Sequence, residues 1–353
     1  MFRPGLLLNE EYYFEIIAPI LNKYNRKLKY SASLLGYGSD VLGYDDEIST
    51  DHNWGPRLQI FVDKENDIRN EIVEVLQNNL PATYKQYHTN FSEPSEDFTQ
   101  RMIPTDGNKI NHLIEVHNIE LFFSNQIGVD ICKLSLKDWL LIPEQVLIEL
   151  TSGKVFSDGL EKLNRYRELL RYFPLDIQKL RLAAFWNCIA NEEPFVGRAI
   201  RTNDLYSVKL ITNRIINYLM KICFIYAKEY IVYSKWFGRK FNELPIPDNI
   251  KKLVMKTLYE NNANDIEKNL CELYCQIEDL HNTKDYFPEI KNKITDFYGR
   301  PFSVIMASTI VDKILESIED EELKKKPLQA VALDIKIDSE DFTDIKLYNI
   351  LKM

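Results

Sequence analysis

The sequence predicts an α+β domain, with a small mixed sheet and helices, followed by an all-α helical-bundle domain. Two observations predict this order. In the first third of the chain, short segments of alternating apolar residues are separated by helical segments and a glycine-rich turn. After about residue 128 only the periodicity of helices remains. We therefore place the two domains at 1–128 and 129–353.

The composition is that of a folded protein with room for two hydrophobic cores. The chain has 353 residues, of which 45% are hydrophobic and only 12 are glycine. Its formal net charge of −9 argues against a large nucleic-acid surface, because such a surface needs clustered lysine and arginine. A local basic groove stays compatible with that charge.

Cysteine usage and hydropathy predict a cytoplasmic protein that does not span a membrane. The five cysteines are odd in number and scattered, which is typical of a reducing compartment. No signal peptide is expected at the start of the chain. The most apolar helical segment, 208–233, is interrupted by Arg214, Lys221 and Lys228, which a bilayer core disfavours.

The N-terminal domain is expected to contain helices, strands and one long loop. In chain order these are a helix over 9–27, a strand over 29–35, a turn at Gly36–Gly43, one extended hairpin arm comprising 51–54 and 57–62, a helix capped by Asp63 and ended by Leu80-Pro81, a loop over 81–111, and a strand over 112–117. On the last strand, Ile114 and Val116 face the core. Glu115 and His117 therefore point the other way.

The second domain is expected to be helical throughout. The predicted helices are 135–150, 158–172, 175–191, 203–229, 248–276 and 302–318. The segment after Pro327 mixes apolar residues with acids and is expected to add a short strand or to pack over the helices.

Polar residues that could hold a phosphate and a metal ion gather in the first domain. Gly38 lets the backbone approach a phosphate without a Cβ, and Ser39 offers a hydroxyl and an amide. Asp51 and position 53 share one face if the segment is extended, and Glu115 on a later strand completes the set. Oxygen ligands of this kind favour Mg²⁺. The sequence therefore predicts a metal site formed by Asp51, Asn53 and Glu115.

These motifs resemble a known superfamily. Gly38-Ser39, then Asp51-x-Asn53, with Glu115 on a later strand, is similar to the nucleotidyltransferases typified by DNA polymerase beta and kanamycin nucleotidyltransferase. More closely, the chain resembles the DUF4037 family of uncharacterised nucleotidyltransferase-like proteins. The segments that carry this closer resemblance are Gly38–Asp45, Ser49–Arg57, Ser135–Leu140, Glu192–Arg198, Tyr233–Trp236 and Arg300–Phe302.

The resemblance implies the reaction and several residue roles. A nucleoside triphosphate, expected to be ATP, would bind with Mg²⁺, and its NMP group would pass to an unidentified hydroxyl acceptor. Glu193 is implied as general base, with a helix-end acid paired with Arg198 as the alternative. Lys235 is implied as a cation for the triphosphate, or is a surface lysine. Arg57 binds a phosphate or forms a structural ion pair.

One residue departs from the family pattern. The pattern has an acid where this chain has Asn53, and asparagine lacks the negative charge that strengthens metal binding. An engineered substitution, a degenerate enzyme, or a site that works with Asp51 and Glu115 alone would each explain it. The alternative functions are a non-catalytic nucleotide-binding or regulatory protein, and a toxin-like transferase that modifies protein or RNA and docks it through 81–111.

Overall fold

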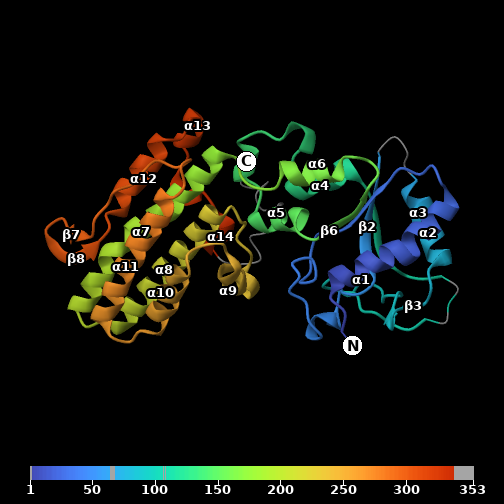
Figure 1. The fold of residues 1–353 in the computed structure, drawn as a ribbon, viewed down its shortest axis with the longest axis horizontal. Coiled ribbons are helices and arrows are strands. Elements are labelled where there is room, and N and C mark those ends of the chain that lie inside the picture. The colour runs from blue at the N-terminus through green and yellow to red at the C-terminus, as the bar shows by residue number, and fades with distance from the viewer. Residues whose placement is uncertain (1, 64–67, 106, 108, 338–353) are drawn as a thin grey trace. The chain divides into compact units, whose positions relative to one another are not determined.

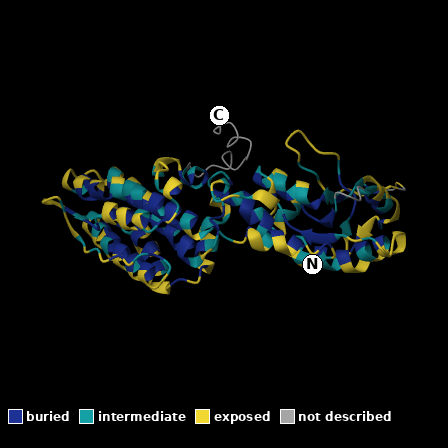
Figure 2. Ribbon diagram, turned by 90° about the horizontal axis from the view of Figure 1, so that it is seen from above, coloured by how far each residue is buried: buried dark blue, intermediate teal, exposed yellow. Residues whose placement is uncertain are grey.

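A computed structural model describes residues 2–63, 68–105, 107 and 109–337. It divides into two compact units. Among these described residues, the first unit comprises those within 2–134 and 146–171, and the second comprises 135–145 and 172–337. Each unit is therefore built from two separate segments of the chain, which alternate along the sequence (Figure 1). Each unit has its own buried interior (Figure 2).

A four-stranded mixed sheet organises the first unit. Its strands are β1 (Ser31–Leu34), β2 (Arg57–Val62), β5 (Leu113–Asn118) and β6 (Lys154–Asp158), in the order β5-β2-β1-β6. β1 runs antiparallel to both β2 and β6, whereas β2 and β5 are parallel. The predicted mixed sheet is present. It also contains β6, which lies after residue 128, where no strand is predicted.

One face of the sheet is covered by helices and forms the core. Ala32, Leu34, Leu58, Ile60 and Ile114 point to this face, as their alternation predicts. The covering helices are α1 (Gly5–Tyr12), the π-helical segment η1 (Tyr13–Ile17), α2 (Ala18–Tyr24) and α3 (Arg69–Asn79). α1, η1 and α2 follow one another without a break. A π-helical turn directly before Pro19 fits the missing N–H of that residue, which cannot bond to the carbonyl four residues earlier.

The remaining elements of the first unit are short. They are η2 (Ile48–Asp51), β3 (Thr83–Tyr84), β4 (Tyr87–His88), α4 (Ile119–Ile127), η3 (Ile131–Lys133), α5 (Glu144–Thr151) and α6 (Leu163–Leu169), and the division between the units falls inside α5. The expected loop 81–111 contains the β3–β4 hairpin and a bridge between Phe91 and Met102.

Helices dominate the second unit, which also contains a β-hairpin. Its elements are η4 (Asp138–Leu140), α7 (Leu175–Arg201), α8 (Leu205–Ala227), α9 (Ser234–Glu243), α10 (Asp248–Tyr259), α11 (Ala263–Asn282), β7 (Thr295–Phe297), β8 (Arg300–Val304), α12 (Ala307–Glu316), α13 (Glu321–Lys324), η5 (Leu328–Ala330) and α14 (Leu333–Ile337). The β7–β8 hairpin means that this unit is not all-α, contrary to the prediction.

Other differences from the predicted elements have local physical causes. α7 continues through Pro194, where the prediction ended it at residue 191. The helix predicted over 248–276 is two helices, because the Asn262 side chain accepts the N–H groups of Asn264 and Asp265 and caps a new helix. The N-cap of α3 is Ile68 and not Asp63, whose carboxylate binds the Lys162 ammonium at 2.5 Å.

A buried charged cluster joins α14 to the second unit. The Arg181 guanidinium binds the Glu144 carboxylate, and the Asp334 carboxylate accepts the Glu144 N–H at 2.9 Å. All three side chains are at most 6% exposed. The described part of the segment after Pro327, residues 328–337, thus packs on this unit and contains the short helix α14 and no strand. Among the described residues, no helix is long and apolar enough to cross a membrane.

Candidate functional site

The second face of the sheet carries polar residues near the glycine turn. On the parallel pair β2–β5, Gln59 lies opposite Glu115 and Phe61 lies opposite His117. Because side chains alternate along a strand, Arg57, Gln59 and Glu115 share one face, opposite to the apolar core. Glu115 and His117 therefore point away from the core, as predicted. Sequence reasoning missed Gln59, although a glutamine between Leu58 and Ile60 in a buried strand is a visible signal.

Glu115 is held as a carboxylate on this face. Its Oε2 lies 2.9 Å from Nε2 of His117, and its side chain is 36% exposed. Burial acts to raise the pKa of Glu115, but the hydrogen bonds from His117 and Gln59 and the charge of Arg57 outweigh burial and lower it. Glu115 therefore offers a negatively charged, partly exposed oxygen pair at neutral pH.

The turn after β1 is built around a buried ion pair. The Arg57 guanidinium donates from Nε to Asp40 Oδ2 at 3.2 Å and from Nη2 to Asp40 Oδ1 at 2.8 Å. Nη2 also donates to the Tyr37 carbonyl at 2.7 Å, and the guanidinium carbon lies 4.8 Å from the centre of the Tyr37 ring. Since Arg57 is 2% exposed, this geometry matches the structural ion pair and leaves no open guanidinium for a phosphate.

Gly38 is required by this ion pair. Its φ is +115°, and a Cβ there would lie 2.3 Å from Asp40 Oδ1 and 2.6 Å from Arg57 Nη2. Gly38 follows β1 as predicted, but turns and not a helix come after it, so no helix N-terminus faces a ligand at this point. Gly38 is exposed and Ser39 is partly exposed, so both remain accessible.

Replacing Gly38 with alanine is expected to destabilise the first unit by about 3 kcal/mol, from backbone strain plus displacement of the ion pair. Gly36 is the matched control. It also has a positive φ, +91°, but nothing lies within 4 Å of its added Cβ. Gly36→Ala should therefore cost only about 1–2 kcal/mol. Urea unfolding measures both variants, and equal losses would contradict a steric role for Gly38.

Asp51 and Asn53 do not lie on an extended segment. Asp51 ends the 3-10 helix η2, and Asn53 has a left-handed φ of 48°. The prediction that their side chains share one face of a strand is therefore wrong. The Asp51 carboxylate is 63% exposed and lies 2.9 Å from Nδ1 of His52. That hydrogen bond lowers the pKa of Asp51.

Asn53 is held by a partner 47 residues away. Its Oδ1 accepts the Gln100 N–H at 2.8 Å, and its own N–H donates to the Gln100 carbonyl at 2.7 Å. The other terminal atom of the side chain is Nδ2, a donor that cannot bind a cation. A carboxylate at this position could accept the same N–H and keep a second oxygen available.

The three residues of the predicted metal site differ in the donor groups that they offer. Glu115 and Asp51 offer ionised oxygens of the right chemistry for Mg²⁺, whereas the single Asn53 oxygen is engaged with Gln100. Within the described part of the chain, no three His, Cys, Asp or Glu side chains are grouped so that they could hold a metal ion. The assignment of Asp51, Asn53 and Glu115 as ligands stays a prediction.

Glu193 lies inside α7 of the second unit and caps α12. Its two carboxylate oxygens accept the N–H groups of Ile305 at 2.9 Å and Ala307 at 2.8 Å, and the residue is 3% exposed. Burial raises its pKa to about 7, against the opposing effect of these backbone hydrogen bonds. Arg198 is not its partner. A carboxylate engaged in this way is a structural cap in the present conformation.

Lys235 is exposed in the first turn of α9. Its ammonium lies 5.0 Å from the centre of the Trp236 ring. Both Lys235 and Glu193 belong to the second unit, whereas the other predicted site residues, Gly38, Ser39, Asp51, Asn53, Arg57 and Glu115, belong to the first. The implied role of Lys235 toward a triphosphate stays a prediction.

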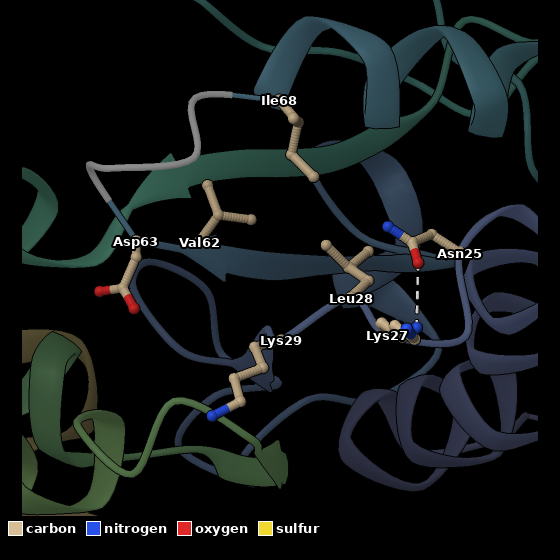
Figure 3. A pocket seen from close by; sticks show the side chains of 7 residues that line it. All are labelled: Asn25, Lys27, Leu28, Lys29, Val62, Asp63 and Ile68. Carbon is tan, nitrogen blue, oxygen red and sulfur yellow. Dashed lines mark hydrogen bonds between the residues drawn. The ribbon is translucent and has the colours of Figure 1, made fainter.

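A hollow of about 320 Å³ lies beside the carboxyl end of β2. In Figure 3 the apolar side chains of Leu28, Val62 and Ile68 point toward a common space. The polar residues that line the hollow are Asn25, Lys27, Lys29 and Asp63. No predicted site residue lines it, and Gly38 follows β1 at the opposite end of β2, so this hollow is separate from the polar face described above.

Comparison with known families adds one finding to this geometry. Residues 139–237 match DUF4037, a domain of unknown function. The matched segment contains α5, β6, α6, α7 and α8 and ends in α9. Glu193 and Lys235 therefore lie within the matched segment, and the Gly38 turn lies outside it. No curated protein matches the chain.

Proposed function

We propose that the chain binds a nucleoside triphosphate with Mg²⁺ on the polar sheet face and acts as a nucleotidyltransferase. The observation that supports this most is the ionised Glu115 carboxylate on the same sheet face as the ion pair that the Gly38 turn encloses. Gly38 and Ser39 would contact the phosphates through the backbone and the Ser39 hydroxyl. ATP is the expected donor, by the resemblance to nucleotidyltransferases.

In the proposed reaction, an acceptor hydroxyl attacks the α-phosphorus, the bond to the bridging oxygen breaks, and pyrophosphate leaves. Glu115 and Asp51 would hold Mg²⁺, which would supply positive charge to the leaving oxygens. The general base is unassigned, because both Glu193 oxygens accept backbone N–H groups. Lys235 keeps the role that the resemblance implies, a cation for a triphosphate.

The contacts of Asn53 favour a second candidate function, nucleotide binding without transfer. The Asn53 Oδ1 accepts the Gln100 N–H, and its Nδ2 cannot bind a cation, so position 53 adds neither negative charge nor a second oxygen ligand. A protein of this kind would respond to nucleotide without consuming it.

Titration calorimetry with Mg-ATP, combined with a pyrophosphate assay, tests both candidates. Asn53→Asp is expected to tighten Mg-ATP binding on the order of tenfold, because it adds a charged oxygen while the contact with Gln100 is kept. Glu115→Gln should weaken binding by a similar factor. Asp97→Asn, which removes an acid bonded to Ser95 and Thr99, is the control and should change nothing.

Binding with pyrophosphate release in the presence of candidate acceptors supports the transferase, and binding without release supports the second candidate. If neither the natural chain nor Asn53→Asp binds Mg-ATP, both candidates are rejected.

A further inference from the structure

Tyr37 is an exposed aromatic residue that packs on a buried charge. It is 41% exposed, whereas Arg57 is 2% exposed and Asp40, the carboxylate partner of Arg57, is 1% exposed. The guanidinium carbon of Arg57 lies 4.8 Å from the centre of the Tyr37 ring, within the range of a cation–π contact. The guanidinium thus occupies one side of the ring, and the exposed part of Tyr37 is accessible to a ligand.

The turn that carries Tyr37 is anchored at two successive residues. The Gly36 N–H donates to the Glu149 carbonyl at 2.7 Å, and the Tyr37 carbonyl accepts Nη2 of Arg57 at 2.7 Å. The ring is therefore held in place before any ligand binds, and binding to it costs little conformational entropy.

The Tyr37 hydroxyl lies within the electrostatic influence of Glu115. Burial chiefly raises the pKa of this hydroxyl, the charge of Arg57 opposes that rise, and the charge of Glu115 adds to it. The Glu115 side chain is 36% exposed, and Ser39, two residues after Tyr37, is partly exposed. The accessible part of Tyr37 is therefore close to the groups proposed above to bind Mg²⁺ and phosphates.

The charge under the Tyr37 ring favours one kind of ligand. Arg57 draws the π electrons of the ring toward itself and makes the opposite side of the ring less negative. The π electrons of a nucleobase meet less repulsion on such a side, whereas the C–H groups of a sugar bind an electron-rich ring better. A purine offers more stacking area than a pyrimidine. We propose that Tyr37 stacks on the purine ring of the bound nucleoside triphosphate, an inference that rests on the function proposed above.

The place of Tyr37 in the turn agrees with this contact. Gly38 and Ser39, which follow Tyr37 directly, are the residues proposed to contact the phosphates. A tyrosine side chain and the ribose that separates a purine from its α-phosphate span similar lengths. One ligand can therefore place its phosphates at Gly38 and Ser39 and its purine on Tyr37.

Calorimetry with two probes, Mg-ATP and Mg-tripolyphosphate, separates the purine from the phosphates. Tyr37→Leu removes the ring but keeps the backbone carbonyl that Arg57 binds, and it should weaken Mg-ATP binding roughly tenfold without changing Mg-tripolyphosphate binding. Tyr37→Phe keeps the ring and should bind Mg-ATP as the natural chain does. Tyr24→Leu is the matched control and should change neither affinity, because Tyr24 is 37% exposed on α2, which covers the opposite face of the sheet.

Nuclear Overhauser transfer detects the contact directly. In a deuterated chain in which only the tyrosine rings are protonated, the adenine ring protons of bound ATP should receive magnetisation from a tyrosine. Tyr37→Phe, whose phenylalanine ring is then deuterated, should lose this signal while it keeps its affinity for Mg-ATP. Tyr24→Phe should keep both.

Several results would overturn the inference and leave the proposed function standing. They are binding of Mg-ATP without a tyrosine signal at adenine, a signal that Tyr37→Phe keeps, an unchanged Mg-ATP affinity in folded Tyr37→Leu, and equal weakening of both probes by that variant. If the natural chain binds neither probe, the proposed function is rejected and the inference with it. Circular dichroism verifies that each variant is folded, and the Tyr37→Phe signal decides the matter if Tyr37→Leu is not.

Discussion

Asp40→Ala is expected to lower the free energy of unfolding of the first unit by about 3–5 kcal/mol. The substitution leaves the Arg57 guanidinium buried without its carboxylate, and an uncompensated buried charge is among the most destabilising changes a core can receive. Of the acceptors described above for the Arg57 guanidinium, the backbone carbonyl of Tyr37 would remain. Urea unfolding, with hydrogen exchange of the β2 amides as the probe, measures this free energy in the first unit.

A double variant separates the charge from the packing. Arg57→Met combined with Asp40→Leu removes both charges while keeping most of the volume, and it should recover most of the stability that Asp40→Ala loses. A loss below about 1 kcal/mol in Asp40→Ala would contradict the buried-pair account, as would a double variant less stable than the single one.

The stability of the second unit is expected to fall as pH rises, with Glu193 as a major cause. The Glu193 pKa is raised from 4.5 to about 7 in the folded chain, chiefly by burial. Between these values the folded state keeps a proton that the unfolded state has lost. The contribution of Glu193 is therefore fully present below about pH 4.5 and is lost by about pH 7, a change of about 3 kcal/mol.

Glu193→Gln should remove this part of the pH dependence, because glutamine does not titrate. Unfolding of the natural chain and of the variant at pH 5 and pH 8 gives the difference directly. Glu192→Gln is the matched control, since the neighbouring carboxylate pairs with Arg214 at 2.9 Å on the surface. If Glu193→Gln and the natural chain lose the same stability between the two pH values, Glu193 is not responsible.

Local patterns were enough to predict the elements whose side chains repeat regularly. The alternation of Leu58 and Ile60 located β2, and that of Ile114 and Val116 located β5 together with the outward direction of Glu115. The sequence does not predict β6, whose residues, apart from the last one, fall between the helices expected over 135–150 and 158–172. These five residues form a strand by pairing with the distant β1. Long-range pairing of this kind has no local signal.

The sequence predicts which residue types form the candidate site better than it predicts their backbone conformations and partners. Sequence placed Gly38 after β1 and left the ion-pair role of Arg57 open, but its partner Asp40 becomes evident only when the turn folds back on β2. The sequence predicts an extended conformation for Asn53. In the structure Asn53 is bonded to Gln100, which lies 47 residues further along the chain. Neither reading of Glu193, general base or helix-end acid paired with Arg198, predicts its backbone contacts, because the N–H groups that it accepts belong to the distant Ile305 and Ala307.

Because β6 comes after the other three strands of its sheet in the sequence, its position constrains how the nascent chain folds. A polypeptide released at residue 128 would have the β5-β2-β1 strands but would leave the outer backbone of β1 unpaired, a template for aggregation. During synthesis, the sheet is complete only when residues 135–145 and then β6 have been made. The first unit is complete only when α6 has followed. A recombinant fragment of the first unit must therefore extend to Arg171, and it then carries residues 135–145, which belong to the second unit.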